Sequence, residues 1–253
     1  MFTRALLKEP CRNLAKGLST AGLGVPDHEK ALAQHAAYAE ALRSCGLAVT
    51  VLGADDNYPD SVFIEDTAVL SEKVAVITRP GAPSRRGEED TVARALAKYY
   101  DRLEHIVAPG TLEGGDVLRA GNRFFIGISA RTNEAGGSQL AAILTKNGYQ
   151  AVRVPLRYVL HLKTGVAYLE DNRLLAHGEF VNHRQLEQFA IIPVMDKEAY
   201  AANSLWINGR VLVPAGFALT KKAIEAAGCN TLAVDVSEFR KLDGGLSCLS
   251  LRF

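Results

Sequence analysis

The sequence predicts an α/β fold in which five similar units, each a hairpin, a helix and a third strand (ββαβ), form a ring. The unit recurs at intervals of 50, 49, 39 and 44 residues. Its starting points lie near Asp66, Asp116, Gly165, Ser204 and Cys248. The fifth copy has room for one strand only. A strand at residues 2–8 can complete it, and pairing of the two chain ends removes the open sheet edges.

Local signals predict the elements of each unit. Asp27 as a helix cap and Gly46 as a helix stop, with apolar residues at helical spacing between them, predict a helix over residues 27–45. Asn208-Gly209 between two apolar runs is a strong hairpin signal. Further helices are expected at residues 88–100, 138–147, 183–189 and 220–227. Strands are expected at residues 2–8, 47–52, 61–70, 74–78, 106–107, 117–118, 123–128, 151–154, 161–168, 174–176, 204–207, 211–213, 231–234 and 248–252.

Composition and charge narrow the function classes. The 253 residues are 48% hydrophobic with a net charge of +1, which is typical of a globular protein and gives no general attraction for nucleic acid or membrane surfaces. No apolar run is long enough for a membrane span. Without a linker or composition break, we expect a single catalytic domain over residues 1–253. The four cysteines are too widely spaced for a disulfide framework, which favours the reduced cytoplasm.

Polar residues recur at one end of the first strand of each unit, and a ring brings these ends together. They include several carboxylates, one imidazole and one thiol: Asp60, Glu65, Asp66, Glu113, Asp116, His161, Asp243 and Cys248. A cysteine and a histidine with an orienting carboxylate form a nucleophilic arrangement. So many carboxylates disfavour a thiolate, but a bound cation reverses that effect. A guanidinium held flat by carboxylates would offer its central carbon to the sulfur.

Each of these residues also has an ordinary structural interpretation. A lone cysteine is more often a small buried hydrophobe than a nucleophile, which is how we interpret Cys11, Cys45 and Cys229. His161 alone could equally be a hydrogen-bonded structural histidine. The other histidines are interpreted as structural or solvated.

Six segments, spread from residue 59 to residue 248, resemble a known family. They are Pro59-Asp60-Ser61-Val62-Phe63-Ile64-Glu65-Asp66, Ile77-Thr78-Arg79-Pro80-Gly81-Ala82, Ser84-Arg85-Arg86-Gly87-Glu88, Ala130-Arg131-Thr132-Asn133, Leu160-His161-Leu162-Lys163-Thr164 and Asp243-Gly244-Gly245-Leu246-Ser247-Cys248. In these segments the chain resembles the dimethylarginine dimethylaminohydrolases, especially the bacterial form, within the guanidino-group-modifying amidinotransferase superfamily. The resemblance implies a five-bladed α/β propeller (pentein).

The resemblance also implies a role for individual residues. Cys248 would attack the guanidinium carbon, His161 would protonate the departing amine and then activate water, and Glu113 would orient His161. Asp66 would bind the guanidinium with support from Asp243 and Glu65. The remaining implied substrate contacts are Asp60 and the backbone of Leu18 for the α-amino group, Arg85 and Arg131 for the α-carboxylate, Phe63 beside the substrate, and Ser247.

One position separates two related substrate classes. Arginine deiminases resemble this chain around the histidine but carry an aspartate two residues later, where this chain has Lys163. Loss of that aspartate leaves room for methyl groups and favours hydrolysis of Nω-methylated L-arginine to L-citrulline and a methylamine. The alternatives are an arginine or other guanidine deiminase on the same fold, and a non-catalytic binder of methylarginine. The resemblance implies no cofactor and no metal, and the sequence leaves open whether the chain forms a homodimer.

Overall fold

The computed structural model describes all 253 residues, which fall into two compact units. Unit 1 comprises Met1–Ile64 and Gly165–Phe253, and unit 2 comprises Glu65–Thr164. The single domain over residues 1–253 stays a prediction. None of the helices combines the length and the apolar character that crossing a membrane requires.

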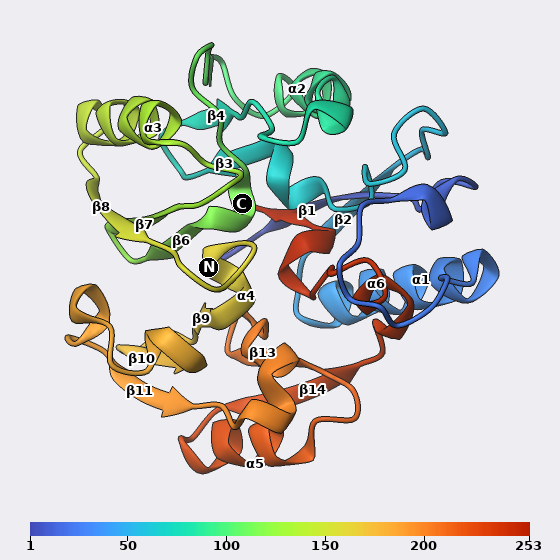
Figure 1. Ribbon diagram of the computed structural model, residues 1–253, viewed down its shortest axis with the longest axis vertical. Helices are drawn as coiled ribbons and strands as arrows, with labels where there is room; N and C mark the ends of the chain where they lie inside the picture. The colour runs from blue at the N-terminus through green and yellow to red at the C-terminus, as the bar shows by residue number, and fades with distance from the viewer. The chain divides into compact units, whose positions relative to one another are not determined.

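Unit 2 contains two three-stranded sheets with the same connectivity (Figure 1). In each sheet the first two strands are antiparallel, and a helix leads to a third, parallel strand. The first sheet is β3 (Ala68–Leu70), β4 (Ala75–Ile77) and β5 (Leu103–His105), with α2 (Glu88–Leu96). The second is β6 (Val117–Ala120), β7 (Arg123–Ile128) and β8 (Gln150–Pro155), with α3 (Glu134–Lys146). A buried core that includes Val76, Phe124 and Leu140 joins these elements.

Unit 1 contains three further sheets with the same strand pairing, and in the first of them short turns replace the helix before the third strand. They are β9 (Val166–Tyr168), β10 (Arg173–Ala176) and β11 (Ala190–Pro193); β12 (Leu205–Ile207), β13 (Arg210–Pro214) and β14 (Asn230–Val234), with α5 (Ala218–Ala226); and β15 (Leu251–Arg252), β1 (Arg4–Lys8) and β2 (Ala48–Leu52), with α1 (His28–Ser44). In the last sheet β1 pairs antiparallel with β15 and parallel with β2. The strand near the start of the chain therefore completes the interrupted fifth ββαβ repeat, as predicted.

Several local predictions are confirmed. The side chain of Asp27 accepts a hydrogen bond from the backbone nitrogen of Lys30 at the start of α1, and Gly46, at φ +88°, follows its end. Asn208 and Gly209 both have positive φ between β12 and β13, which is the backbone that a two-residue hairpin turn requires.

The first strand of each ββαβ repeat begins later than predicted. Short helical turns precede them: η2 (Ile64–Thr67), η4 (Gly114–Asp116), α4 (Leu162–Gly165), η7 (Asp196–Ala202) and η8 (Ser247–Leu249). Polar side chains in these turns bind backbone groups, as when Asp66 accepts a hydrogen bond from the nitrogen of Gly115 at 2.9 Å. Such bonds compete with strand pairing. Cys248 thus lies in a turn, not in the predicted strand, and His161 immediately precedes one.

Other predicted boundaries are wrong. In place of the predicted helix over residues 183–189 there is one short turn, η6 (Arg184–Leu186), and a second turn, η5 (Gly178–Phe180), precedes this range; the two turns bury Leu186 and Phe180. The strand predicted at residues 106–107 lies at β5. The cap of α3 is Asn133, so this helix begins before the predicted residue 138, and α2 ends before residue 100. The remaining short elements are η1 (Leu14–Lys16), η3 (Pro83–Arg85) and α6 (Ser237–Arg240).

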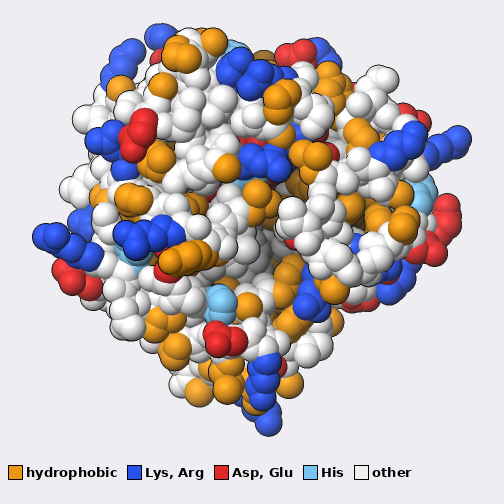
Figure 2. Space-filling model, in the orientation of Figure 1, with side chains coloured by type: hydrophobic (Ala, Val, Ile, Leu, Met, Phe, Trp, Pro, Cys, Tyr) orange, Lys and Arg blue, Asp and Glu red, His pale blue; other side chains and the backbone are white.

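The visible surface agrees with a nearly neutral chain. On the face shown in Figure 2, Lys and Arg side chains are interspersed with Asp and Glu, and hydrophobic side chains occur in small groups. No single sign of charge dominates this face.

Candidate active site

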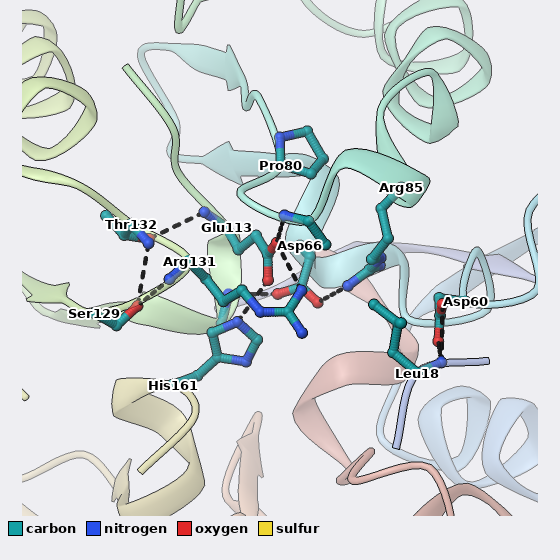
Figure 3. A network of polar contacts seen from close by, with 12 residues as sticks. Leu18, Asp60, Asp66, Pro80, Arg85, Glu113, Ser129, Arg131, Thr132 and His161 are labelled. Atoms are coloured by element: carbon teal, nitrogen blue, oxygen red, sulfur yellow. Dashed lines mark hydrogen bonds and ion pairs between the residues drawn. The ribbon is translucent and has the colours of Figure 1, made fainter. Parts of the chain in front are cut away.

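A buried ion pair between His161 and Glu113 lies at the centre of the polar residues of unit 2 (Figure 3). The Nε2 atom of His161 lies 2.7 Å from Oε2 of Glu113. Glu113 immediately precedes η4, and His161 immediately precedes α4. Each side chain therefore lies next to the short turn with which a ββαβ repeat begins. Gly115 lies against the imidazole, because a Cβ there would come within 2.9 Å of its Nδ1 atom.

The charges around this pair favour a protonated histidine. Burial alone lowers the pKa of His161, but the charge of Asp66 and the hydrogen bond to Glu113 outweigh it and raise the pKa to about 9. Burial alone raises the pKa of Glu113, but the hydrogen bond from His161 and the positive charges nearby lower it to about 2. At neutral pH the pair is therefore an imidazolium and a carboxylate.

Asp66 and Arg85 form a second buried ion pair in unit 2 (Figure 3). The Nη1 atom of Arg85 lies 2.6 Å from Oδ2 of Asp66, while its Nε and Nη2 atoms donate to Glu88. The carboxylates that face it, including Asp66, Glu88 and Glu113, raise the pKa of Arg85 further against the effect of burial. Arg85 is thus held by two carboxylates within its own unit.

Asp116 orients the backbone next to His161. Its Oδ1 atom accepts a hydrogen bond from the nitrogen of Leu162 at 2.9 Å, and its Oδ2 atom accepts one from the hydroxyl of Ser129 at 2.7 Å. Burial raises the pKa of Asp116, and the charge of His161 opposes that rise. Asp116 is fully buried and fixes the start of α4, and so the position from which the imidazole projects.

Lys163 and Glu65 form an ion pair, with 2.6 Å between Nζ and Oε1. Arg131 lies near Glu113, at 3.5 Å from Nη1 to Oε1, and is about one-fifth exposed. Thr132 accepts a hydrogen bond through its hydroxyl from the nitrogen of Glu113 (Figure 3). Unit 2 thus contains six of the predicted site residues: Glu65, Asp66, Arg85, Glu113, Arg131 and His161.

The ligand atoms of Asp66, Glu113 and His161 lie within 4.8 Å of one another and could together hold a cation. A carboxylate pair and an imidazole suit a divalent metal, and the same two carboxylates suit a guanidinium. The residues therefore permit both kinds of cation.

In unit 1, the predicted binding carboxylates are held by backbone nitrogens. Both oxygens of Asp60 accept hydrogen bonds from the nitrogen of Leu18, at 2.9 and 3.2 Å (Figure 3). Oδ2 of Asp243 accepts from the nitrogen and the hydroxyl of Thr20, at 2.5 and 3.0 Å. Asp243 has φ +60°, in the left-handed region. Both carboxylates thus hold the segment that contains Leu18 and Thr20.

The segment that contains Cys248 is a tight turn. The nitrogen of Gly245 donates to Sγ of Cys248 at 3.4 Å, and the nitrogen of Cys248 donates to the carbonyl of Gly245 at 3.2 Å. A Cβ on Gly244 would lie 2.1 Å from the ring of Phe63, so the glycine is needed for this close approach. Phe63 is buried and packs edge-on against Phe239. Cys248 itself is partly exposed.

Sequence reasoning missed several supporting residues. Glu88, three residues after Arg85 in the chain, could have been found as an ion-pair spacing. Asp116 was noted among the polar residues but given no role. Tyr200 and Asn203, which bind the Cys248 turn, carry no local signal, because their partners lie 44 residues away.

Comparison with known proteins decides the family. The model of the eukaryotic N,N dimethylarginine dimethylhydrolase family matches residues 26–249. The chain belongs to this family. A dimethylarginine dimethylaminohydrolase from Pseudomonas aeruginosa is 48% identical to it, with 100% of both chains covered. One from Streptomyces coelicolor is 38% identical, over 98% of this chain and 96% of the relative.

Solved structures of dimethylarginine dimethylaminohydrolases have the same fold. A cysteine-to-serine variant of the Pseudomonas aeruginosa enzyme in complex with citrulline gives a TM-score of 0.99, at 48% identity with 100% of both chains covered. A histidine-to-glycine variant, an adduct with S-methyl-L-thiocitrulline, gives 0.98 at the same identity and coverage. With the five sheets described above, this confirms the predicted fold class, the five-bladed α/β propeller (pentein) of ββαβ units.

Proposed function

We propose that this member of the family hydrolyses Nω-methylated L-arginine, as asymmetric dimethylarginine or monomethylarginine, to L-citrulline and dimethylamine or methylamine. The observation that carries the proposal is the buried Glu113–His161 ion pair, which holds a proton on His161 at neutral pH. An amine is a poor leaving group until it is protonated, so a positioned acid is the chief requirement of this reaction. The relatives that cover the whole chain support the same activity.

The first step forms a covalent intermediate. The thiolate of Cys248 attacks the central carbon of the guanidinium and forms a carbon–sulfur bond, while the carbon–nitrogen π electrons move to nitrogen. The positive charge of the substrate favours the thiolate over the thiol. Asp66, supported by Glu65 and Asp243, holds the guanidinium flat, and Ser247 contributes to the same end of the substrate.

His161 then acts as the acid. It gives its proton to the substituted nitrogen, the carbon–nitrogen bond breaks, and dimethylamine leaves. The product on the enzyme is a thiouronium cation bonded to Cys248. Glu113 keeps the imidazole oriented and stabilises its charged form before the transfer.

The second half returns the enzyme to its starting state. His161, now neutral, takes a proton from a water molecule that attacks the thiouronium carbon. As the tetrahedral intermediate collapses, the carbon–sulfur bond breaks, its remaining hydroxyl proton passes to solvent, and neutral citrulline leaves while the thiolate of Cys248 is restored.

The amino-acid end of the substrate is bound by residues of both charges. Asp60 and the backbone of Leu18 hold the α-ammonium group, Arg131 and Arg85 hold the α-carboxylate, and Phe63 packs beside the chain. Because Arg85 is already bound by Asp66 and Glu88, we expect Arg131, which is partly exposed, to be the principal carboxylate ligand.

Lys163 accounts for the preference for methylated arginine. Its ammonium neutralises Glu65 at 2.6 Å, so that Glu65 has less charge to offer an unsubstituted guanidinium nitrogen. The residue at this position is cationic, where arginine deiminases carry an aspartate. This favours a methylated substrate over free arginine.

The amine that is released tests the proposal. Wild-type protein with asymmetric dimethylarginine should yield citrulline and dimethylamine in equal amounts, and Cys248→Ser should yield neither. Cys229→Ser is the matched control, because Cys229 is a partly buried cysteine of the same unit that packs in a separate core cluster. Ammonia release from arginine that exceeds dimethylamine release would instead indicate a deiminase. Ligand binding without turnover in wild type would indicate a non-catalytic binder.

We further propose that the reaction needs no metal or organic cofactor, that the protein works in the cytoplasm, and that its partner is the small methylarginine substrate. Full activity after chelation and metal analysis of the active enzyme would support the first point. Zinc at one equivalent that is required for turnover would contradict it. Light scattering distinguishes a monomer from a homodimer.

A further inference from the structure

The Cys248 turn is bound from one side by a segment that has no role in the proposed chemistry. This segment consists of Tyr200, in η7, and Asn203, immediately before β12. The hydroxyl of Tyr200 donates to the carbonyl of Gly244 at 2.7 Å. The amide of Asn203 accepts from the nitrogen of Ser247 at 2.9 Å and donates to its hydroxyl at 3.1 Å. The residues directly before Cys248 are thus bound at two points.

Asn203 also touches the backbone that binds the sulfur. A Cβ on Gly245 would lie 2.5 Å from Cγ of Asn203, so the side-chain amide packs directly on the Cα atom of Gly245. The nitrogen of Gly245 is the group that donates to Sγ of Cys248. Hydrogen bonds to a charged form stabilise that form, so this contact favours the thiolate. Asn203 is 7% exposed and Ser247 is 4% exposed, which shields the contact from water.

The Tyr200 ring is itself fixed. The guanidinium of Arg240 lies 4.9 Å from the centroid of the Tyr200 ring and 5.2 Å from that of Phe217, and the two rings lie 5.5 Å apart. Burial, and after it the neighbouring Cys248, raise the pKa of the Tyr200 hydroxyl, so the group remains a hydrogen-bond donor. The hydroxyl therefore has a fixed direction toward Gly244.

We infer that Asn203 and Tyr200 are positioning residues for the nucleophile. They hold the Gly244–Ser247 backbone so that the Gly245 N–H points at the sulfur and Cys248 is placed for attack. The inference rests on the proposed role of Cys248, but it concerns the geometry and ionisation of the thiol, which can be measured without the methylarginine reaction.

Three variants test the inference. Asn203→Ala removes both bonds to Ser247, and Tyr200→Phe removes one hydroxyl while keeping the ring between Arg240 and Phe217. Asn208→Gly is the matched control. Asn208 also binds backbone groups of unit 1, from Phe2 and Cys45, and glycine keeps its positive φ.

Two readouts are needed for each variant. The first is the rate of Cys248 alkylation by iodoacetamide as a function of pH, with the site located by peptide mass spectrometry. The second is kcat and KM for asymmetric dimethylarginine. In Asn203→Ala the alkylation midpoint should move to higher pH, and kcat should fall by about 10²-fold with little change in KM. Tyr200→Phe should lower kcat by about fivefold. Asn208→Gly should lower the melting temperature alone.

A purely structural role predicts a different pattern. If Asn203→Ala and Tyr200→Phe melt earlier but keep the wild-type alkylation midpoint and kcat, the inference is wrong. If Asn203→Ala does not fold, Tyr200→Phe decides the question by the same two readouts. Should wild-type protein fail to hydrolyse methylarginine, the proposed function fails, while the alkylation midpoints still test the positioning role.

Discussion

The two units hold their predicted site residues by different means. In unit 2 the partners are charged: His161 with Glu113, Arg85 with Asp66 and Glu88, and Lys163 with Glu65. In unit 1 the partners are mostly neutral. Backbone nitrogens bind Asp60 and Asp243, and an amide and a hydroxyl bind the Cys248 turn.

The difference matches the chemistry proposed for each set. Moving a proton requires a group whose ionisation is controlled, and neighbouring charges provide that control for His161. Placing a nucleophile requires a fixed backbone, which neutral hydrogen bonds and close glycine contacts provide for Cys248. Loss of one partner of a buried ion pair should also cost more stability than loss of one neutral hydrogen bond.

The largest expected effect comes from removing the charge of Glu113. Glu113→Gln keeps the shape of the side chain but no longer favours the imidazolium, so kcat should fall by about 10²- to 10⁴-fold with a smaller change in KM. Steady-state kinetics with asymmetric dimethylarginine measure this. Glu134→Gln is the control, because Glu134 pairs with Arg153 on the surface of the same unit, and its kcat should equal that of wild type. Equal kcat in the two variants would remove Glu113 from the mechanism.

The next effect is on stability and compares the units directly. Arg85→Ala leaves two buried carboxylates without their partner and should lower the free energy of unfolding by about 3–5 kcal/mol. Asp60→Asn in unit 1 keeps an oxygen for the nitrogen of Leu18 and should cost about 1 kcal/mol. The exposed pair variant Arg153→Ala should change stability by no more than about 1 kcal/mol. Denaturant titration measures all three, and similar losses in Arg85→Ala and Asp60→Asn would contradict the comparison.

A third prediction uses two buried histidines with opposite shifts. The pKa of His161 in unit 2 is raised to about 9, so its stabilising contribution is complete below the unfolded value near 6.5 and is lost as pH rises through 9. The pKa of His35 in unit 1 is lowered to about 4, by burial first, so its contribution is present above 6.5 and is lost as pH falls toward 4.

The loss of each histidine's contribution should lower the free energy of unfolding by roughly 3 kcal/mol. Denaturant titrations across pH 4 to 9.5 should show the alkaline loss disappear in His161→Gln and the acidic loss diminish in His35→Gln. If His161→Gln loses as much stability at alkaline pH as wild type does, His161 is not held protonated by its neighbours.

Much of the fold follows from signals that lie close together in the sequence. The cap at Asp27, the turn at Asn208-Gly209 and the recurring ββαβ unit each depend on a few neighbouring residues. The pairing of β1 with β15 was predictable because an incomplete unit needs a partner strand. The turns before the first strands were not, because they depend on bonds between distant residues, such as Asp66 to Gly115.

The same limit applies to the site. The family resemblance predicts roles for Cys248, His161 and Glu113, but it does not show how each side chain is held. Arg85 and Asp66, which form an ion pair, are 19 residues apart in the chain. Asn203 and Ser247, which are joined by hydrogen bonds, are 44 residues apart. These contacts exist only once the fold brings the segments together, so they could be found only in the structure.

Covalent catalysis by Cys248 on a methylated arginine is the central claim, and mass spectrometry of the intact protein during turnover tests it most directly. Rapidly quenched samples with asymmetric dimethylarginine should contain a thiouronium adduct, located at Cys248 by peptide mapping, while dimethylamine accumulates in solution. Turnover of wild-type protein with no adduct on Cys248 at any time, or a Cys248→Ser variant that remains active, would contradict the account.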